Sequence, residues 1–391
     1  MEKLCFFTMA NKKRLGWAQR LISSGDVVGR PIWFYRIPDS HPDPKRYKIE
    51  LLMGDLLPEA EKYVYLDSDT FMLQYGDWES SECVGAALEN FRQDYRQGFS
   101  DEKGHEAFCK LYKEYEAPER VNTGCVVLPS DIRKQVAQRW MEWCHKIDAF
   151  CEKPSKTRDQ MHFAFVRKEF GLPILPSRFN ALIKREEVLP DHILIHAAGK
   201  PHGDDVKSYH DAVNRVLGGY LWSIPQTEMG YRWQVITYLI LLYAENPTFP
   251  VIAEIGVDVG ETANHLLRSF PGLKLYAVDN WCRGLKRYDA WCKVRGQYDD
   301  HIVELKCLSD EPVLEEFLDL VFIDANHTTE QTVRDIEHWL PQVKNGGVIV
   351  GHDIDHKSKT GSVSSVRRAV EVVFGSNFKT GPDYTWWTVK K

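Results

Sequence analysis

The sequence predicts two α/β domains in tandem, and three observations lead to this prediction. The chain has 391 residues, more than a single hydrophobic core usually supports. Two stretches, residues 3–22 and 250–267, each have the pattern of a short apolar strand, a turn and a helix. In both halves short apolar strands alternate with helical stretches, which is typical of parallel sheets covered by helices.

The boundary between the two domains is expected near Gly218, Gly219 and Pro225, because glycine and proline interrupt regular structure. We therefore predict a first domain over 1–217, a linker over 218–230 and a second domain over 231–391. The segment Glu228–Tyr243 is densely apolar and predicts a helix that leads into the second domain.

Composition excludes several classes of protein. With 43% apolar residues, 27% charged residues and a net charge of -6, the chain resembles an ordinary globular protein and lacks the basic surface of a nucleic-acid binder. The longest apolar run, Val235–Tyr243, is too short to span a membrane, and the N-terminus does not have the pattern of a signal peptide. Nine cysteines without a CxxC pair argue against a disulfide framework or zinc ribbon. We therefore expect a cytoplasmic protein. The sequence does not indicate an oligomeric state.

Two carboxylates follow an apolar strand in the first half. The strand Lys62–Leu66 is followed by Asp67, Ser68 and Asp69, and a period of two places both aspartates on one side. Two like charges this close resist joint ionisation unless a cation lies between them. Mg²⁺ or Mn²⁺ bound to phosphate oxygens would satisfy them. The alternative is a solvated turn after a strand.

Further motifs follow the aspartate pair in a fixed order. They are Val121-Asn122-Thr123-Gly124 before the strand Cys125–Leu128, then Arg158-Asp159-Gln160, then the strand His192–Ile195 with His196, and finally Gly199-Lys200-Pro201. Together with the pair, this order resembles the glycogenin-like retaining glycosyltransferases of the GT-A fold. The resemblance covers roughly residues 1–215.

The resemblance implies a UDP- or GDP-sugar donor, a glycan acceptor and a Mn²⁺ or Mg²⁺ ion. Its implied metal ligands are Asp67, Asp69 and His196. Its implied donor-binding and catalytic residues are Thr8, Asn11 and Lys48 toward the nucleotide, Lys200 on the diphosphate, and Asn122, Asp159 and Gln160 at the sugar. A structural role is the alternative for His196. His196 and Lys200 are closer together in sequence than in the usual family pattern.

The second half opens with a glycine-containing turn. The strand Val251–Ile255 runs into Gly256, Asp258 and Gly260, and glycines at such a turn let the backbone approach a ligand. The strand Lys274–Val278 ends at Asp279, at the spacing where an acid binds ribose hydroxyls. A dinucleotide fingerprint would need GxGxxG, whereas this segment is ExGxDxG. It resembles the first motif of class I methyltransferases, with Asp258 replacing the middle glycine. This implies that Glu254, Gly256, Gly260 and Asp279 bind S-adenosylmethionine.

Two later strands of this half end in acids and histidines. Leu320–Ile323 is followed by Asp324 and His327, and Val348–Val350 by His352 and Asp353. These parts, with the closing segments VSSVRRAVEVVF and TWWTVKK, resemble sugar and natural-product O-methyltransferases of the macrocin methyltransferase and cephalosporin-hydroxylase-like group. The resemblance covers about residues 228–391.

The second resemblance implies a Mg²⁺ site from Asp324, His352 and Asp353, with His327 as the catalytic base. A sugar hydroxyl is a poor nucleophile, so a base, a metal or both must assist methyl transfer. His352 stands where the relatives often carry an acid. The alternative is that His327 caps the following helix and His352 packs at a strand end.

The two halves together predict a GT-A domain followed by a Rossmann-like class I methyltransferase domain. The implied function is glycan assembly, in which one domain adds a sugar with retention and the other O-methylates a sugar hydroxyl. One alternative makes the second half an NAD(P)-dependent sugar oxidoreductase. Another makes one half a non-catalytic binding module.

Overall fold

The computed structural model describes residues 2–81, 83–88, 102–115, 121–151, 160–182, 191–196, 231–356 and 364–391. The chain divides into two compact units, 1–216 and 217–391, next to the predicted boundary at residue 217. The predicted linker 218–230 lies within the second of these ranges and outside the described residues. In the parts of the chain described above, no helix combines the length and the apolar character needed to cross a membrane.

The first unit alternates strands and helices. Its elements are β1 (Glu2–Ala10), η1 (Lys12–Arg14), α1 (Leu15–Val27), β2 (Ile32–Arg36), α2 (Tyr47–Met53), β3 (Ala60–Asp67), β4 (Thr70–Met72), β5 (Gly85–Leu88), α3 (Glu102–Glu114), β6 (Val121–Pro129), α4 (Ser130–Asp148), α5 (Gln160–Glu169), β7 (Ile174–Leu175), η3 (Ser177–Phe179), β8 (Ala181–Leu182) and β9 (Leu194–His196).

The main sheet of the first unit is mixed, whereas the sequence predicted a parallel sheet covered by helices. Its order is β2-β1-β3-β6-β5-β7. β1 is parallel to β2 and β3, whereas β6 is antiparallel to both β3 and β5. β6 begins at the carboxyl end of β3 and runs back, with Cys125 opposite Leu66. The first residues of β6 therefore lie at the same sheet edge as the end of β3.

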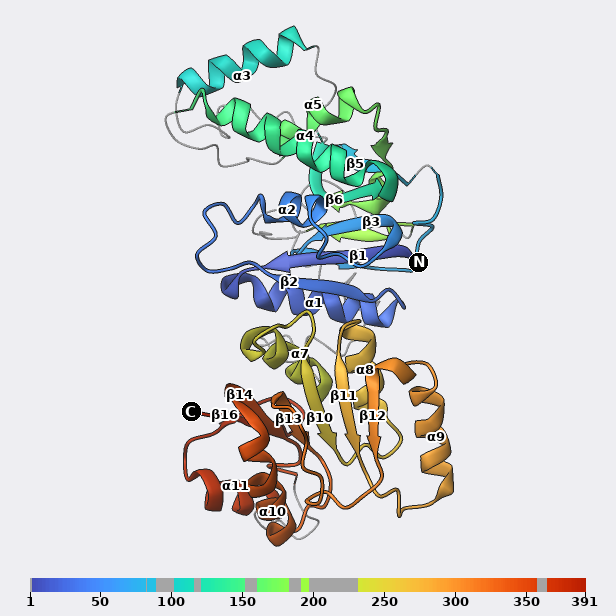
Figure 1. Ribbon diagram of the computed structural model, residues 1–391, viewed down its shortest axis with the longest axis vertical. Helices are drawn as coiled ribbons and strands as arrows, with labels where there is room; N and C mark the ends of the chain where they lie inside the picture. Colours follow the sequence, from blue (N-terminus) through green and yellow to red (C-terminus); the bar gives the residue numbers. More distant parts are fainter. Residues whose placement is uncertain are drawn as a thin grey trace. The chain divides into compact units, whose positions relative to one another are not determined.

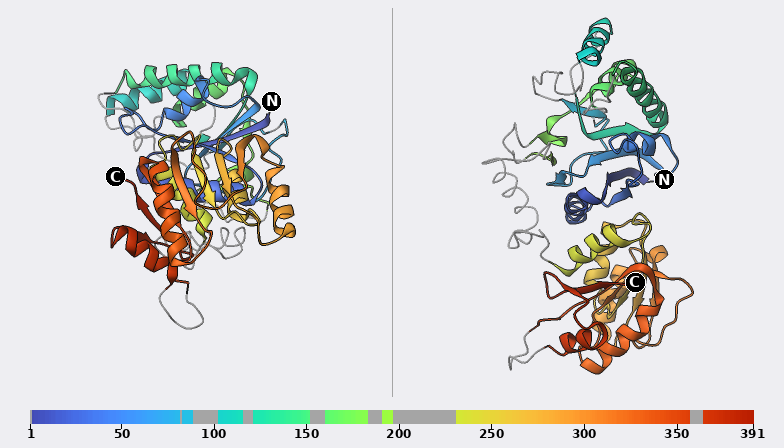
Figure 2. Two further views of the ribbon diagram at one scale, coloured as in Figure 1. Left: turned by 60° about the horizontal axis from the view of Figure 1, so that its bottom comes forward. Right: turned by 90° about the vertical axis from the view of Figure 1, so that its left-hand side faces the viewer.

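Alternating side chains of the first unit bury both faces of this sheet. Phe7 and Tyr65 belong to a core that also contains Trp140 and Trp143 of α4. Leu21 and Ile22 of α1 are buried as well, and α1 and α4 lie on opposite sides of the sheet (Figures 1 and 2). Because both faces are covered, polar groups can meet ligands only at the ends of the strands.

The second unit is a doubly wound α/β fold. Its elements are α7 (Arg232–Tyr243), β10 (Val251–Ile255), α8 (Glu261–Ser269), β11 (Lys274–Val278), α9 (Leu285–Arg295), η4 (Asp299–His301), β12 (Ile302–Leu305), β13 (Leu318–Ile323), α10 (Thr329–Trp339), η5 (Leu340–Gln342), β14 (Val343–Gly351), α11 (Ser365–Phe374), β15 (Lys379–Thr380) and β16 (Trp386–Val389).

The order of the parallel strands in this sheet changes direction between β10 and β13. The order is β12-β11-β10-β13-β14-β16-β15, with β10 parallel to β11 and β13, and β16 antiparallel to β14. Ile336 and Trp339 of α10 and Val366 and Val370 of α11 pack in the core with the sheet. In such sheets ligands bind beyond the carboxyl ends of the strands where the order reverses, which here is between β10 and β13.

Candidate functional sites

The first candidate site lies where β3, β6 and β9 meet. Asp67 is the last residue of β3 and lies opposite Met9 of β1. The chain then turns through Asp69 into β4, where Thr70 pairs with His196 of β9. Strand pairing therefore brings the late histidine beside the aspartate pair, although more than a hundred residues separate them in sequence.

Asp67, Asp69 and His196 offer three ligand atoms that all lie within 4.8 Å of one another. His196 Nε2 lies 3.3 Å from Asp69 Oδ1 and 3.8 Å from Asp67 Oδ2. Two carboxylates and an imidazole suit Mn²⁺ and related divalent ions. The donor set therefore fits the metal that the resemblance implies, and binding itself stays a prediction.

The oxygen of Asp67 that faces away from His196, Oδ1, already has interaction partners. Tyr65 donates its hydroxyl to Asp67 Oδ1 at 2.5 Å, and Lys48 Nζ lies 3.7 Å from the same atom. Lys48 is 2% exposed and also donates to both oxygens of Thr123, at 3.1 and 3.2 Å. These contacts fix the rotation of Asp67 and leave Oδ2 directed toward His196.

The charges of the site stabilise one another. Burial raises the pKa of Asp69, but its hydrogen bond to His196 and the charges of His196 and Arg14 together outweigh this effect and hold the pKa below its usual value. Burial lowers the pKa of His196, yet Asp69 and Asp67 raise it above its usual value. His196 Nε2 therefore faces negative charge, and either a proton or a metal ion must balance it.

The other predicted residues of the first half are spread around this site. Thr8 ends up fully buried near the end of β1, and its hydroxyl has no hydrogen-bond partner among the described residues. Asn11 accepts from Lys13 N at 3.1 Å at the start of η1, and Gln160 begins α5.

Lys48 and Asn122 are buried behind the ligand atoms, so their predicted contacts with the donor remain predictions. Asp159 and Lys200 lie outside the described residues.

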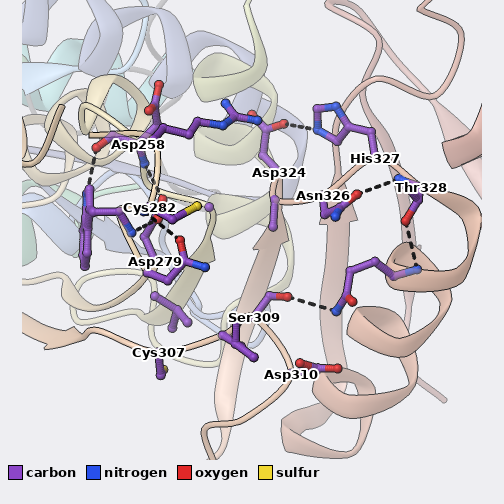
Figure 3. Close-up of a pocket in the computed structure, with 18 of the residues that line it drawn as sticks. Asp258, Asp279, Cys282, Cys307, Ser309, Asp310, Asp324, Asn326, His327 and Thr328 are labelled. Carbon is purple, nitrogen blue, oxygen red and sulfur yellow. Dashed lines mark hydrogen bonds and ion pairs between the residues drawn. The ribbon is translucent and has the colours of Figure 1, made fainter. Parts of the chain in front are cut away.

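The second candidate site is a pocket of about 800 Å³ at the reversal point between β10 and β13. Asp258 and Asp279 line one side, and Asn326, His327 and Thr328 the other, with Asp324 between them (Figure 3). The sequence-predicted residues Gly256, Asp279, Asp324 and His327 thus line one cavity. Glu254, Gly260, His352 and Asp353 are not among the residues that line it.

The loop after β10 is shaped by positive φ angles. Gly256, Asp258 and Gly260 have φ values of 91°, 55° and 82°. Aspartate tolerates the left-handed region better than most residues, which explains how Asp258 can replace the middle glycine. Asp279 holds this loop, since it accepts from Asp258 N at 2.8 Å and from Trp281 N at 2.6 Å.

Acids and histidines from the ends of β13 and β14 form the other half of the site. His327 Nε2 lies 3.2 Å from Asp324 Oδ1, and His327 Nδ1 lies 3.0 Å from Asp353 Oδ2. The hydrogen bond to Asp324 raises the pKa of His327. In the described part of the unit, Asp324, His327 and Asp353 are the set whose ligand atoms lie close enough for a metal. His352 Nδ1 lies 3.7 Å from Asp324 Oδ1, so the predicted metal role of His352 stays a prediction beside that of His327.

His352 instead faces a loop that the sequence did not connect with the site. Its Nδ1 lies 3.3 Å from Asp353 Oδ1, and its Nε2 lies 3.6 Å from Asp383 Oδ1 in the β15–β16 loop. Burial lowers the pKa of His352, but interactions with Asp353 and Asp383 outweigh it and raise the pKa to about 9. Glu254 is 2% exposed, and burial and the nearby charge of Asp324 raise its pKa.

Sequence reasoning missed several residues of this pocket. Trp281 donates from its indole nitrogen to Asp258 O at 2.9 Å, and Arg287 forms an ion pair with the Asp258 carboxylate. Ser309 and Gln331 line the pocket and both bond to buried Asp335. Trp281 lies two residues after Asp279, so the loop after that strand end was the available signal. Ser309 and Gln331 belong to no recognisable motif, so no signal in the sequence indicated them.

Gly256 is required by a close approach of two backbones. A Cβ at this position would lie 2.3 Å from the carbonyl oxygen of Asp324 and 2.7 Å from Ala325 Cα. Gly256→Ala is expected to cost about 1–2 kcal/mol for the left-handed backbone and about 1–3 kcal/mol more for displaced packed atoms. Thermal unfolding of the second unit, followed by calorimetry, measures the loss.

Gly346→Ala is the matched control, because Gly346 has φ 81° and nothing within 4 Å of the added Cβ. It should show the backbone cost alone. Equal losses of stability for the two variants would mean that the loops after β10 and β13 can separate freely, contrary to the contact described above.

Comparison with known proteins found matches to the second unit of the chain. Residues 253–354 match the sequence family described as a methyltransferase domain. No curated protein matches the chain. Similar solved structures include an O-methyltransferase from Bacillus cereus in complex with SAH (18% identity, 49% of this chain and 94% of that chain, TM-score 0.32). Others are a SAM-dependent O-methyltransferase from Thermotoga maritima (12%, 40% and 64%, 0.31) and the N-methyltransferase NodS from Bradyrhizobium japonicum (14%, 36% and 86%, 0.26). The family match places a methyltransferase domain in the second unit of this chain.

Proposed function

We propose that the chain is a bifunctional glycan-assembly enzyme, with a metal-dependent glycosyltransferase in its first unit and an S-adenosylmethionine-dependent O-methyltransferase in its second. The observation that carries the second activity is the pocket with Asp279 on one side and Asp324 and His327 on the other. An acid at the end of β11 is suited to ribose hydroxyls, and the opposite acids and histidine are suited to a hydroxyl acceptor.

In this proposal the methyl group passes from sulfonium to an acceptor oxygen, so a C–S bond breaks and a C–O bond forms. The acceptor proton goes to His327 or to a neighbouring carboxylate. Residues Asp324, His327 and Asp353 would hold Mg²⁺, which would polarise the acceptor oxygen. The pocket residues orient the two reactants, which is the main requirement of this transfer.

The glycosyltransferase part of the proposal is supported by the convergence of Asp67, Asp69 and His196 at one sheet edge. Those three residues would hold Mn²⁺ or Mg²⁺, which would neutralise the departing diphosphate of a UDP- or GDP-sugar. The orphaned hydroxyl of buried Thr8, beside the end of β3, offers a hydrogen bond to such a donor. We further propose a glycan as acceptor, a sugar hydroxyl as the methylated group and a cytoplasmic location.

Two assays test the proposal. Incubation with a panel of nucleotide sugars, with and without Mn²⁺, should reveal metal-dependent donor hydrolysis or transfer. Calorimetry should reveal binding of S-adenosylhomocysteine. Tight binding of NADH without binding of S-adenosylhomocysteine would instead favour an oxidoreductase, and failure of every donor in the presence of Mn²⁺ would remove the glycosyltransferase assignment.

Asp279→Ala is expected to weaken binding of S-adenosylhomocysteine by about 1–3 kcal/mol, the usual cost of losing hydrogen bonds to a charged group. Two causes combine, since in this proposal Asp279 holds the ribose, and it also accepts from the backbone of Asp258 and Trp281. Calorimetric titration measures the change.

Asp310→Ala is the matched control, because Asp310 lines the same pocket but follows a different strand. It should bind S-adenosylhomocysteine within a few-fold of the unchanged chain. Unchanged affinity in Asp279→Ala would contradict the placement of the ribose at the end of β11.

A further inference from the structure

A buried asparagine contacts the candidate metal ligand of the first unit from behind. Asn122 and His196 are each 2% exposed. The distance between Asn122 Oδ1 and His196 Nδ1 is 3.1 Å, and the other ring nitrogen of His196 faces Asp69 and Asp67. The imidazole is therefore held between an amide on one side and the carboxylate pair on the other.

The identity of the asparagine atom follows from its other neighbours. Gly124 N donates to Asn122 Oδ1 at 2.8 Å. A backbone N–H can only donate, so the atom that it contacts must be the amide oxygen and not the amide nitrogen. Asn180 Nδ2 donates to the same oxygen at 2.9 Å. The oxygen is an acceptor in all three contacts, so His196 Nδ1 must carry the hydrogen.

The geometry of β6 holds the asparagine in this position. Asn122 and Gly124 are two residues apart on one strand and so face the same side. A Cβ at Gly124 would lie 2.1 Å from His196 Cε1 and 2.3 Å from His196 Nδ1, which shows how closely the strand approaches the ring. Pairing of β5 with β6 is irregular here, as Ala86 pairs with Val126 but Ala87 with Asn122.

We infer that Asn122 is a positioning residue that fixes His196 in the tautomer with hydrogen on Nδ1, so that the lone pair of Nε2 is presented to a divalent cation between Asp67 and Asp69. The inference rests on the proposed function of the first unit. A histidine ligand commonly donates its other ring N–H to a nearby acceptor, which fixes the ring orientation. Asn122 thereby acts through His196 rather than by touching the donor sugar.

The test uses Mn²⁺ alone as the probe and the full chain. Asn122→Leu removes the acceptor at nearly constant volume and is expected to weaken Mn²⁺ binding about 10–100-fold. Asn122→Asp keeps an acceptor oxygen and should restore affinity to within a few-fold. Asn180→Ala is the matched control, because it removes a neighbour of the same oxygen without touching His196. Its Mn²⁺ affinity should change little.

A second measurement leaves Asn122 unchanged. In the chain loaded with Mg²⁺, nitrogen NMR of His196, assigned with His196→Gln, should show hydrogen on Nδ1 and none on Nε2. Hydrogen on Nε2 alone, or Mn²⁺ affinity of folded Asn122→Leu equal to that of the unchanged chain, would overturn the inference while leaving the metal site in place. Mn²⁺ binding that is insensitive to Asp67→Asn and Asp69→Asn would overturn the metal site and the inference together.

Discussion

Replacing Asp67 or Asp69 by asparagine is expected to lower sugar transfer and donor hydrolysis on the order of 10³-fold or more, while methyl transfer continues. In the proposed function each carboxylate would supply charge that holds the metal, and the metal would neutralise the leaving diphosphate. The second site lies in a separate unit with its own sheet and core. Parallel assays of donor hydrolysis and methyl transfer on the same preparation measure both effects.

The choice of asparagine matters for Asp67. Lys48 is 2% exposed beside this carboxylate, and removing the partner of a buried charge destabilises a protein by several kcal/mol, about 3–5 kcal/mol in typical cases. Asparagine keeps an oxygen that can accept from Tyr65, whereas alanine does not. Loss of activity in Asp67→Ala alone could therefore reflect unfolding, and unfolding curves should accompany the kinetics.

Asp55→Asn provides a control in the same unit, because the Asp55 side chain is 87% exposed and pairs only with Lys134 among the ion pairs of the described residues. It should leave both activities unchanged. Full sugar transfer by the Asp67→Asn, Asp69→Asn double variant in the presence of a chelator would show that the aspartate pair has no metal role.

Much of the architecture could be predicted from local sequence. The strand that ends at Asp67 and the strand Lys274–Val278 were recognised because a continuous apolar run is followed directly by an acid. The helix predicted over Glu261–Leu267, because glycines precede it, is observed over Glu261–Ser269. Residues that belong to such strand ends, namely Asp67, Asp69, His196, Asp279 and Asp324, do lie at the two candidate sites.

Features that depend on pairing between distant segments could not be predicted this way. The apolar run after Gly124 does not reveal that β6 is antiparallel to β3, because a strand buried on both faces has the same pattern in either direction. The place of Asn122 behind His196 follows from that direction. The contact of His352 with Asp383 depends on the conformation of a loop in which Asp383 and Tyr384 have positive φ angles. No sequence motif predicts this loop.

His327→Ala is expected to slow methyl transfer by about 10²–10⁴-fold, the usual contribution of a positioned acid or base, with little change in the affinity for S-adenosylhomocysteine. The side chain is 43% exposed, lines the pocket and lies between Asp324 and Asp353. In the proposed function it acts on the acceptor hydroxyl and not on the adenosine. Steady-state kinetics and calorimetry on the same variant separate the two quantities.

Mg²⁺ dependence distinguishes the two roles that this position allows. If His327 is a metal ligand, as its place between two carboxylates indicates, high Mg²⁺ should recover part of the lost rate in His327→Ala. If it is only the base, Mg²⁺ should recover nothing. His301→Gln is the control, because His301 lies in the same unit and contacts the carbonyl of Leu273 instead; its rate should be unchanged. An equal loss of cofactor affinity in His327→Ala and Asp279→Ala would remove His327 from catalysis, because a group that acts only on the acceptor cannot weaken cofactor binding as much as the residue that holds the ribose.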